Sequence, residues 1–205
     1  MNPKKILIAC EYSGRVRNAF LAKGHDATSC DILPTESPGP HYQGDVMDII
    51  NDGWDMMIAF PPCTYLANSG VRWLYPSTKY LDIAKVQRGT QRWKDLIDGA
   101  VFYRDIAHAE IEKIVMENPI MHGWGQKIIG TLDDFLCQII QPWMFGHGET
   151  KATQLQVKGL PLLKPTNIVD GREARIHKMS PGPNRGKDRA LILPGIANAF
   201  AEQWG

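Results

Sequence analysis

KILIACEYSG, residues 5–14, is a short apolar run that ends in a turn of polar and small residues. A helical pattern follows from Arg15 to Lys23. A strand, a tight turn and a helix in this order form the opening unit of a parallel α/β sheet. Because functional groups gather at the carboxyl ends of parallel strands, the residues that follow each strand are the first candidates for a site.

Further apolar runs alternate with helical patterns along the chain. Strands are predicted at 26–31, 54–60, 113–117, 136–141 and 153–157, and a long helix at 78–109 with a break near Gly89. Near-continuous apolar strands separated by helices predict an α/β fold, a mostly parallel, Rossmann-like sheet with helices on both faces. With 205 residues, the chain is expected to form a single domain, 1–205.

Composition narrows the classes of function. The net charge of +1 gives no overall basic field that would indicate nucleic-acid binding, so any such case rests on local clusters. No run of about 18 apolar residues is present, and the first apolar run is too short for a signal peptide, so we expect a cytoplasmic protein with no membrane partner. The four cysteines are scattered without metal-ligand spacing, so neither a metal site nor a disulfide framework is expected.

Polar or reactive residues follow the predicted strands: Glu11, Asp31, Asp45, Cys63 and Glu117. Asp31, at the end of the second strand, is placed to accept hydrogen bonds from ribose hydroxyls. Asp45 is placed to accept a hydrogen bond from an adenine amino group. Each aspartate, taken singly, fits a helix cap or a turn equally well.

Cys63 follows two prolines directly after a strand, in the stretch AFPPCTY of residues 59–65. Proline fixes its own φ and restricts the residue before it, so the thiol is held in one direction, as a nucleophile requires. Glu117 ends the apolar stretch IVME, where burial should raise its pKa and let it donate a proton near neutrality. A loop cysteine and a structural glutamate are the alternatives, but a nucleophile and an acid at one sheet edge are far more specific together.

The pattern resembles the cytosine-5 DNA methyltransferases. Their Pro-Cys nucleophile motif is matched by Pro62-Cys63, and their Glu-Asn-Val acid motif by Glu117-Asn118 with Pro119 in place of Val. The resemblance extends over most of the chain and is closest to compact phage-type DNA methylases, through CEYSG at 10–14, PPCTYLANSG at 61–70 and FGH at 145–147.

The resemblance implies a reaction and its residues. Cys63 would attack carbon 6 of cytosine while Glu117 protonates ring nitrogen 3, and carbon 5 would take a methyl group from S-adenosylmethionine. Asn118 would hold the acid loop, and Lys151 is the nearest counterpart of the family's base-contacting arginine. A cytosine in duplex DNA would first have to flip out, whereas one in a single strand would not. The cofactor would be bound by residues at four strand ends: Glu11, Ser13, Gly14, Asp31, Asp45, Phe60 and Pro62.

The chain departs from the family pattern at three places. Glu11 and Tyr12 stand where the cofactor loop usually has small residues, and Thr64 stands where Gln usually follows the nucleophile. No large target-recognition domain is present, because only a short basic, Pro/Gly-rich segment, 158–193, separates the Lys151 region from the last family-like stretch, PGIAN at 194–198.

This basic segment carries eight Lys/Arg against three Asp/Glu. Its arginines and lysines are candidates for phosphate contacts, and we single out Arg172, Arg175, Lys178 and Arg185, although a solvated loop explains the charges too. So short a segment has little room to read base edges, which predicts low or very short sequence specificity.

Other readings stay open. The missing recognition domain would suit an enzyme of the same fold that acts on a free cytidine nucleotide. The altered cofactor loop would suit a non-catalytic relative that binds nucleic acid or a nucleotide. Two roles are open for the aromatic residues Trp73, Tyr75 and Trp93. They either flank the site and stack on a base, or they fill the core, and core filling is favoured for Trp93. A lone histidine such as His147 is more often structural than functional.

Overall fold

The mostly parallel sheet is present in a computed structural model that describes residues 2–75, 83–183 and 185–205. The described residues form seven strands in the order β3-β2-β1-β4-β5-β7-β6. The strands are β1 (Lys5–Ala9), β2 (Asp26–Asp31), β3 (His41–Gln43), β4 (Met56–Ala59), β5 (Lys113–Pro119), β6 (Leu136–Ile140) and β7 (Thr153–Lys158). The pairs from β3 to β5 are parallel, and β7 is antiparallel to both of its neighbours. The predicted α/β fold is thus confirmed.

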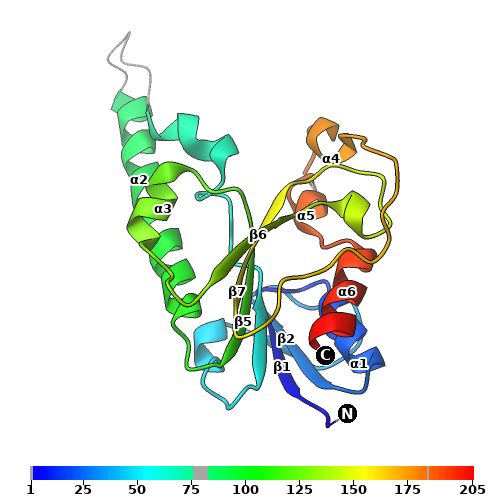
Figure 1. The fold of residues 1–205 in the computed structure, drawn as a ribbon. Helices are drawn as coiled ribbons and strands as arrows, with labels where there is room; N and C mark the ends of the chain where they lie inside the picture. Colours follow the sequence, from blue (N-terminus) through cyan, green and yellow to red (C-terminus); the bar gives the residue numbers. More distant parts are fainter. Residues whose placement is uncertain (1, 76–82, 184) are drawn as a thin grey trace.

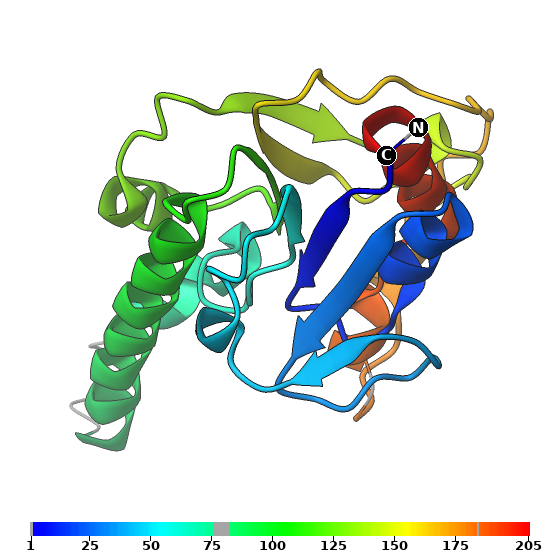
Figure 2. The same cartoon turned by 90° about the horizontal axis from the view of Figure 1, so that it is seen from below.

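Helices cover both faces of this sheet (Figures 1 and 2). The helices are α1 (Arg15–Ala22), α2 (Ile83–Ala107), α3 (Gly123–Ile129), α4 (Arg175–Lys178), α5 (Arg185–Ala190) and α6 (Pro194–Trp204), with 3-10 turns η1 (Val46–Asp48), η2 (Asn68–Leu74) and η3 (Pro142–Met144). No helix among the described residues is long and apolar enough to cross a membrane.

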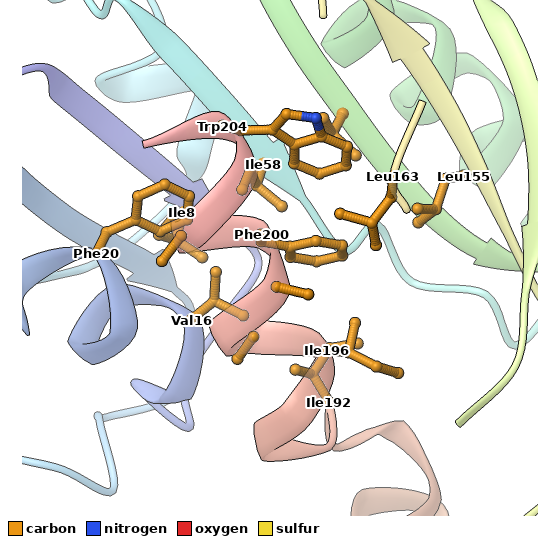
Figure 3. Close-up of a cluster of buried hydrophobic side chains, with 14 of the residues drawn as sticks. Ile8, Val16, Phe20, Ile58, Leu155, Leu163, Ile192, Ile196, Phe200 and Trp204 are labelled. Atoms are coloured by element: carbon orange, nitrogen blue, oxygen red, sulfur yellow. The ribbon is translucent and has the colours of Figure 1, made fainter. Parts of the chain in front are cut away.

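The strands place alternate side chains in two cores. Ile6 and Ile8 of β1 face α1 and α6, where Phe20, Phe200 and Trp204 pack together (Figure 3). Leu7 and Ala9 of the same strand face α2 and the core around its Leu96, Ala100 and Tyr103. Because both faces of the central strands are buried, these strands are near-continuously apolar, as the sequence shows.

The prediction of a long helix needs one correction. α2 continues through Gly89, so the predicted break there is wrong. A helical glycine costs about 1 kcal/mol relative to alanine, and the other turns of this 25-residue helix outweigh that cost. The predicted start at 78 lies outside the described residues, which resume at Ile83.

The basic segment, 158–193, returns from β7 along the sheet edge and contains α4 and α5. Its start is fixed by Gln138 of β6, whose side chain accepts from the Leu163 N–H at 2.9 Å and donates to the Leu163 carbonyl at 2.7 Å. Gln203 of α6 bonds both backbone groups of Lys164 in the same way, at 2.8 Å each. The segment therefore leaves the sheet at a defined place and passes toward the carboxyl ends of the strands (Figure 1).

Candidate active site

A cavity of about 700 Å³ lies at the carboxyl ends of the parallel strands. Its lining brings together the turn after β1, the loop after β4, the end of β5 and the start of β7, and it includes Cys63, Glu117 and Lys151. One wall is formed by the basic segment, through Ile176 and Arg189 among others. Its volume suits a ligand of nucleotide size, since sites for small molecules enclose roughly 300–1,000 Å³.

The nucleophile candidate Cys63 is held in a fixed turn. The backbone N–H groups of Leu66 and Ala67 both donate to the Cys63 carbonyl, at 3.1 and 2.9 Å. Arg92 of α2 donates to the carbonyl of the next residue, Thr64, at 2.8 Å. The side chain is half-buried, so the thiol is both accessible from the cavity and limited in its orientations.

Glu117, the acid candidate, is 8% exposed and lies on β5 between apolar residues and the cavity. Burial raises the pKa of this carboxyl, while the positive charge of Lys151 and a hydrogen bond with the Thr153 side chain lower it in part. The net shift is upward, so a larger share of Glu117 is protonated at a given pH than for an exposed glutamate.

The two candidates influence each other. Burial raises the pKa of the Cys63 thiol, and the negative charge of Glu117 raises it further, whereas Lys151 and Arg189 lower it. When Glu117 is protonated its contribution vanishes, and the two cations then favour the thiolate. Protonation of Glu117 therefore removes one of the two causes that raise the pKa of Cys63 and leaves burial, the larger cause, opposed by the two cations.

Glu11 and Ser13 line the cavity, and both also build the start of α1. The Glu11 carboxylate accepts from the N–H groups of Val16 at 2.8 Å and Arg17 at 3.3 Å, and from the Ser13 hydroxyl at 3.0 Å. Burial raises the pKa of Glu11, and these bonds oppose that shift. Gly14 has φ 71°, a left-handed conformation that glycine adopts without strain, and it is outside the cavity lining.

Asp31 and Asp45 lie beside the cavity without lining it. Asp31 accepts from the Leu33 N–H at 2.9 Å, and Asp45 caps η1 by accepting from the Met47 N–H at 3.0 Å. Their negative charges help to raise the pKa of the Cys10 thiol, after its burial, and Cys10 does line the cavity. Phe60 and Pro62, the other predicted cofactor contacts, are both in the lining.

Asn118 is 1% exposed, and neither atom of its side-chain amide has a hydrogen-bond partner within the described parts of the chain. The expected role of holding the acid loop is therefore not carried out by hydrogen bonds of this amide. A buried amide without partners costs about 1–3 kcal/mol, which marks the site as locally unfavourable for stability.

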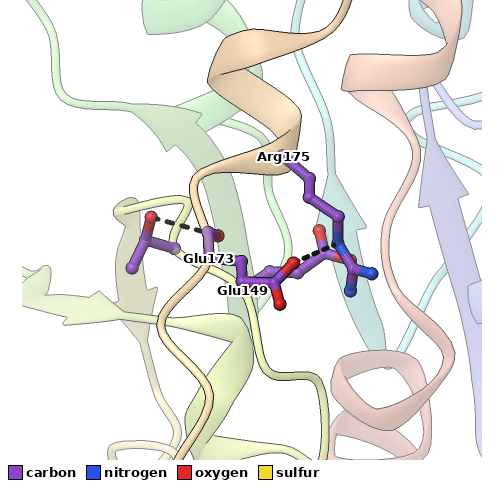
Figure 4. Close-up of polar contacts among 4 residues, drawn as sticks. Glu149, Glu173 and Arg175 are labelled. Atoms are coloured by element: carbon purple, nitrogen blue, oxygen red, sulfur yellow. Dashed lines mark hydrogen bonds and ion pairs between the residues drawn. The ribbon is translucent and has the colours of Figure 1, made fainter.

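The four predicted phosphate contacts lie on the basic segment outside the cavity lining. Arg175 pairs with Glu149 at 2.8 Å and with Glu173 at 3.4 Å (Figure 4). Arg172 stacks on the ring of Trp143, 4.0 Å from its centroid. Lys178 is exposed, and Arg185 donates to the Met179 carbonyl at 2.7 Å.

Several cavity residues were not singled out from the sequence. Arg189 was counted among the basic residues of its segment, and nothing in its local sequence distinguishes it from the others. Thr153, which is buried beside the cavity without lining it, lies in the stretch that resembles the family's arginine motif and in the alternating strand pattern of 153–157. Tyr12 lines the cavity, and its buried hydroxyl has no hydrogen-bond partner among the described residues. His147 is structural, because its Nε2 accepts from the Gly195 N–H at 2.9 Å.

The sequence matches no protein-family model and no curated protein sequence. The structure is similar to those of methyltransferases. The methyltransferase EhMeth of Entamoeba histolytica matches with a TM-score of 0.50 and 14% identity over 87% of this chain and 60% of that one. A prophage-encoded Escherichia coli protein, described as a DNA modification methyltransferase, matches with a TM-score of 0.47 and 16% identity over 80% of this chain and 51% of that one.

The Dnmt2 methyltransferase of S. pombe matches with a TM-score of 0.44 and 11% identity over 88% of this chain and 55% of that one. This chain thus spans about half to three fifths of the length of the three proteins. The match to the Entamoeba enzyme shows that the chain has the Rossmann-like fold of that methyltransferase.

Proposed function

We propose that the chain is an S-adenosylmethionine-dependent methyltransferase that acts on carbon 5 of cytosine in DNA. The observation that carries this proposal is the presence of a half-buried thiol, Cys63, and a buried carboxyl, Glu117, in the lining of one cavity at the strand ends. The methyltransferase fold supports the reaction type. A thiol nucleophile and a carboxyl acid in one cavity are the two groups that addition to a pyrimidine ring requires.

The residues divide the reaction between them. The Cys63 thiolate adds to carbon 6 of the ring, and protonated Glu117 donates to ring nitrogen 3, so that carbon 5 becomes nucleophilic. The positive charges of Lys151 and Arg189 oppose the rise in the Cys63 pKa and so favour its thiolate form. The Thr153 side chain, whose hydroxyl donates to the Lys151 carbonyl at 3.2 Å, opposes part of the rise in the Glu117 pKa. After methyl transfer, a water molecule takes the carbon-5 proton, the bond from carbon 6 to sulfur breaks to release the Cys63 thiolate, and ring nitrogen 3 returns its proton to Glu117.

The cavity fits the methyl donor in its chemistry. The unpartnered Tyr12 hydroxyl and the Ser13 hydroxyl offer polar contacts, and Phe60 and Pro62 offer apolar walls. Glu11, Asp31 and Asp45 supply negative charge near a ligand whose sulfonium and ammonium groups are positive. Bound there, S-adenosylmethionine would supply an electrophilic methyl group, and Gly14 would contribute only through the shape of the turn.

A free cytidine nucleotide is a second candidate substrate, because the basic segment forms one wall of the cavity. Because Ile176, His177 and Arg189 close the cavity on one side, a free cytidine nucleotide would be enclosed there, with Arg189 available to its phosphate. DNA stays our first choice, since the basic segment also presents cations outside the cavity, such as Lys178. On that reading, 158–193 replaces a recognition domain and gives low or short specificity.

The test is nucleoside mass spectrometry of DNA, RNA and cytidine monophosphate, each incubated with the protein and methyl-labelled cofactor. We expect label in 5-methylcytosine from DNA. Cys63→Ser should abolish the label while cofactor binding, measured by calorimetry, stays unchanged. Cys137→Ser, which alters an exposed thiol on β6, is the matched control. Labelled cytosine from Cys63→Ser at the wild-type rate would refute the mechanism, and label confined to the free nucleotide would favour the second substrate.

A further inference from the structure

Aromatic rings gather on the surface formed by η2, α2 and α3. We call Trp73, Tyr75, Trp93 and Trp124 the aromatic face. Trp73, Tyr75 and Trp124 are 60%, 56% and 42% exposed, although rings that only filled a core would be covered. Figure 1 shows α2 and α3, which carry two of these residues, packed side by side on one flank of the sheet.

The rings are held in place by one another. Trp93 is partly buried and its indole N–H donates to the Leu74 carbonyl at 3.1 Å. It makes edge-type contacts with Tyr75 and Trp124, with centroids 6.1 and 5.4 Å apart. The Trp124 indole N–H donates to the Tyr75 hydroxyl. Trp93 therefore holds two exposed rings in a fixed arrangement. Because these side chains are already ordered, they lose little conformational entropy when a ligand binds.

Two cations lie against aromatic rings on this flank of the molecule. In the structure, the Lys127 ammonium lies 5.0 Å from the ring centroid of Trp124. The Arg92 guanidinium lies 4.4 Å from that of Tyr65. Rings combined with cations are typical of surfaces that bind single-stranded nucleic acid.

Two segments of the chain connect the candidate active site with the aromatic face. Ser69 and Ile120 line the cavity. Ser69 is in η2, which leads to Trp73, and Ile120 precedes α3, which carries Trp124. The two routes are joined by the Asn68 N–H donating to the Ile120 carbonyl at 3.3 Å. Both segments therefore lead from the cavity lining to ring-bearing residues of the aromatic face.

We propose that the aromatic face binds an unpaired stretch of the nucleic-acid substrate, with bases stacked on Tyr75 and Trp124 and a phosphate near Lys127. Only unpaired bases offer their faces, because the bases of a duplex are stacked on each other. The proposal rests on the proposed function for the choice of nucleic acid as ligand, and it adds that the nucleotides beside the target cytosine are single-stranded when bound.

The test uses a fluorescein-labelled thymidine 12-mer, which contains no cytosine and needs no cofactor, and measures binding by fluorescence anisotropy. Trp124→Leu keeps an apolar side chain but removes the π surface, and Trp124→Phe keeps a ring. We expect Trp124→Leu to weaken binding by at least about fivefold, since stacking contributes about 1–3 kcal/mol per base, and Trp124→Phe to weaken it less. Tyr75→Leu should act in the same direction.

The matched control is Leu136→Ala on the edge strand β6, whose side chain is as exposed as that of Tyr75, at 56%. It should leave the affinity unchanged. Annealing the 12-mer to its deoxyadenosine complement should remove the sensitivity to Trp124→Leu. Equal affinities of wild type, Trp124→Leu and Tyr75→Leu would overturn the proposal and point to a protein partner for these rings. Because no methyl transfer is measured, this failure is distinct from a failure of the proposed reaction.

Discussion

At the scale of single residues, the site depends on a buried carboxyl. Burial raises the pKa of Glu117 more than Lys151 and Thr153 lower it. Folding therefore favours protonated Glu117, and ionising it in the folded state has a cost that is absent in the unfolded chain. That cost keeps a larger share of Glu117 protonated, and so able to donate a proton, and at the same time the ionised form lowers the stability of the fold.

Glu117→Gln should expose this liability. A carboxyl with a raised folded pKa holds its proton more tightly in the folded chain, so its favourable contribution is complete at low pH. This contribution is lost as pH rises from the ordinary glutamate value, about 4.3, through the raised value. The variant, which cannot ionise, should gain in free energy of unfolding relative to wild type as pH rises, by about 1.4 kcal/mol for each unit of pKa shift. Urea titrations from pH 4 to 9 measure this difference, and a constant difference would contradict the assignment.

The thiol depends on two cations. Because Lys151 and Arg189 both lower the pKa of Cys63, Arg189→Met and Lys151→Met should each raise it and slow alkylation by iodoacetamide at neutral pH. For one partly screened charge we expect about a three- to tenfold change. Mass spectrometry of the Cys63 peptide measures the rate apart from that of exposed Cys137. Lys187→Met, on the same segment, is the control. Equal alkylation rates of Cys63 in all variants would show that Arg189 does not influence the thiol.

From the sequence, Cys63 and Glu117 were indicated by their places after strands, and Lys151 by the family resemblance. The three residues lie in one cavity. It could not identify Arg189, whose position is set by the path of the basic segment over the strand ends. Nor could it show that the Glu11 carboxylate caps α1, since a capping and a ligand-binding acid look alike in a sequence.

At the scale of elements, α6 docks against the turn after η3. Gly195 approaches that turn so closely that a Cβ atom would overlap the Phe145 carbonyl oxygen, and the Gly195 N–H donates to His147. This contact explains why a glycine stands in the first turn of α6, where other residues are better helix formers.

Gly195→Ala should therefore destabilise the protein by about 1–3 kcal/mol, the usual cost of excess volume in a packed contact. Gly99→Ala in α2 is the matched control, because nothing lies within 4 Å of its added Cβ. That control should be neutral or stabilising by up to about 1 kcal/mol, since alanine is the better helix former. Thermal or urea unfolding of the two variants measures the contrast, and similar effects would show that the α6 contact is looser than described.

The elements were predictable where they are long or fully buried, as for β1, β4 and α2. The 3-10 turns and the short helices α3, α4 and α5 were not predicted, because fewer than eight residues give no clear 3.6-residue period. Gly89 misled the prediction for α2, since a local breaker signal was outweighed by the packing of the whole helix.

At the scale of the whole molecule, charge is segregated although the net charge is +1. The basic segment, 158–193, holds eight Lys/Arg and three Asp/Glu, and the rest of the chain holds 15 Lys/Arg and 19 Asp/Glu. This segment supplies Arg189 to the cavity lining. A neutral composition therefore does not argue against an anionic polymer as ligand.

The salt dependence of DNA binding would separate DNA from a free nucleotide as substrate. Each lysine or arginine that contacts a phosphate steepens the fall of log K with log salt by about one. Lys178→Gln with Arg185→Gln should reduce that slope by about two. Arg175→Gln should reduce it less than one, because Glu149 and Glu173 already neutralise this guanidinium. Lys23→Gln, at the C-terminal cap of α1, outside the basic segment and paired with Glu202, should leave the slope unchanged. A slope that none of these variants alters would mean that the basic segment does not contact DNA, and the enclosed nucleotide would become the better substrate.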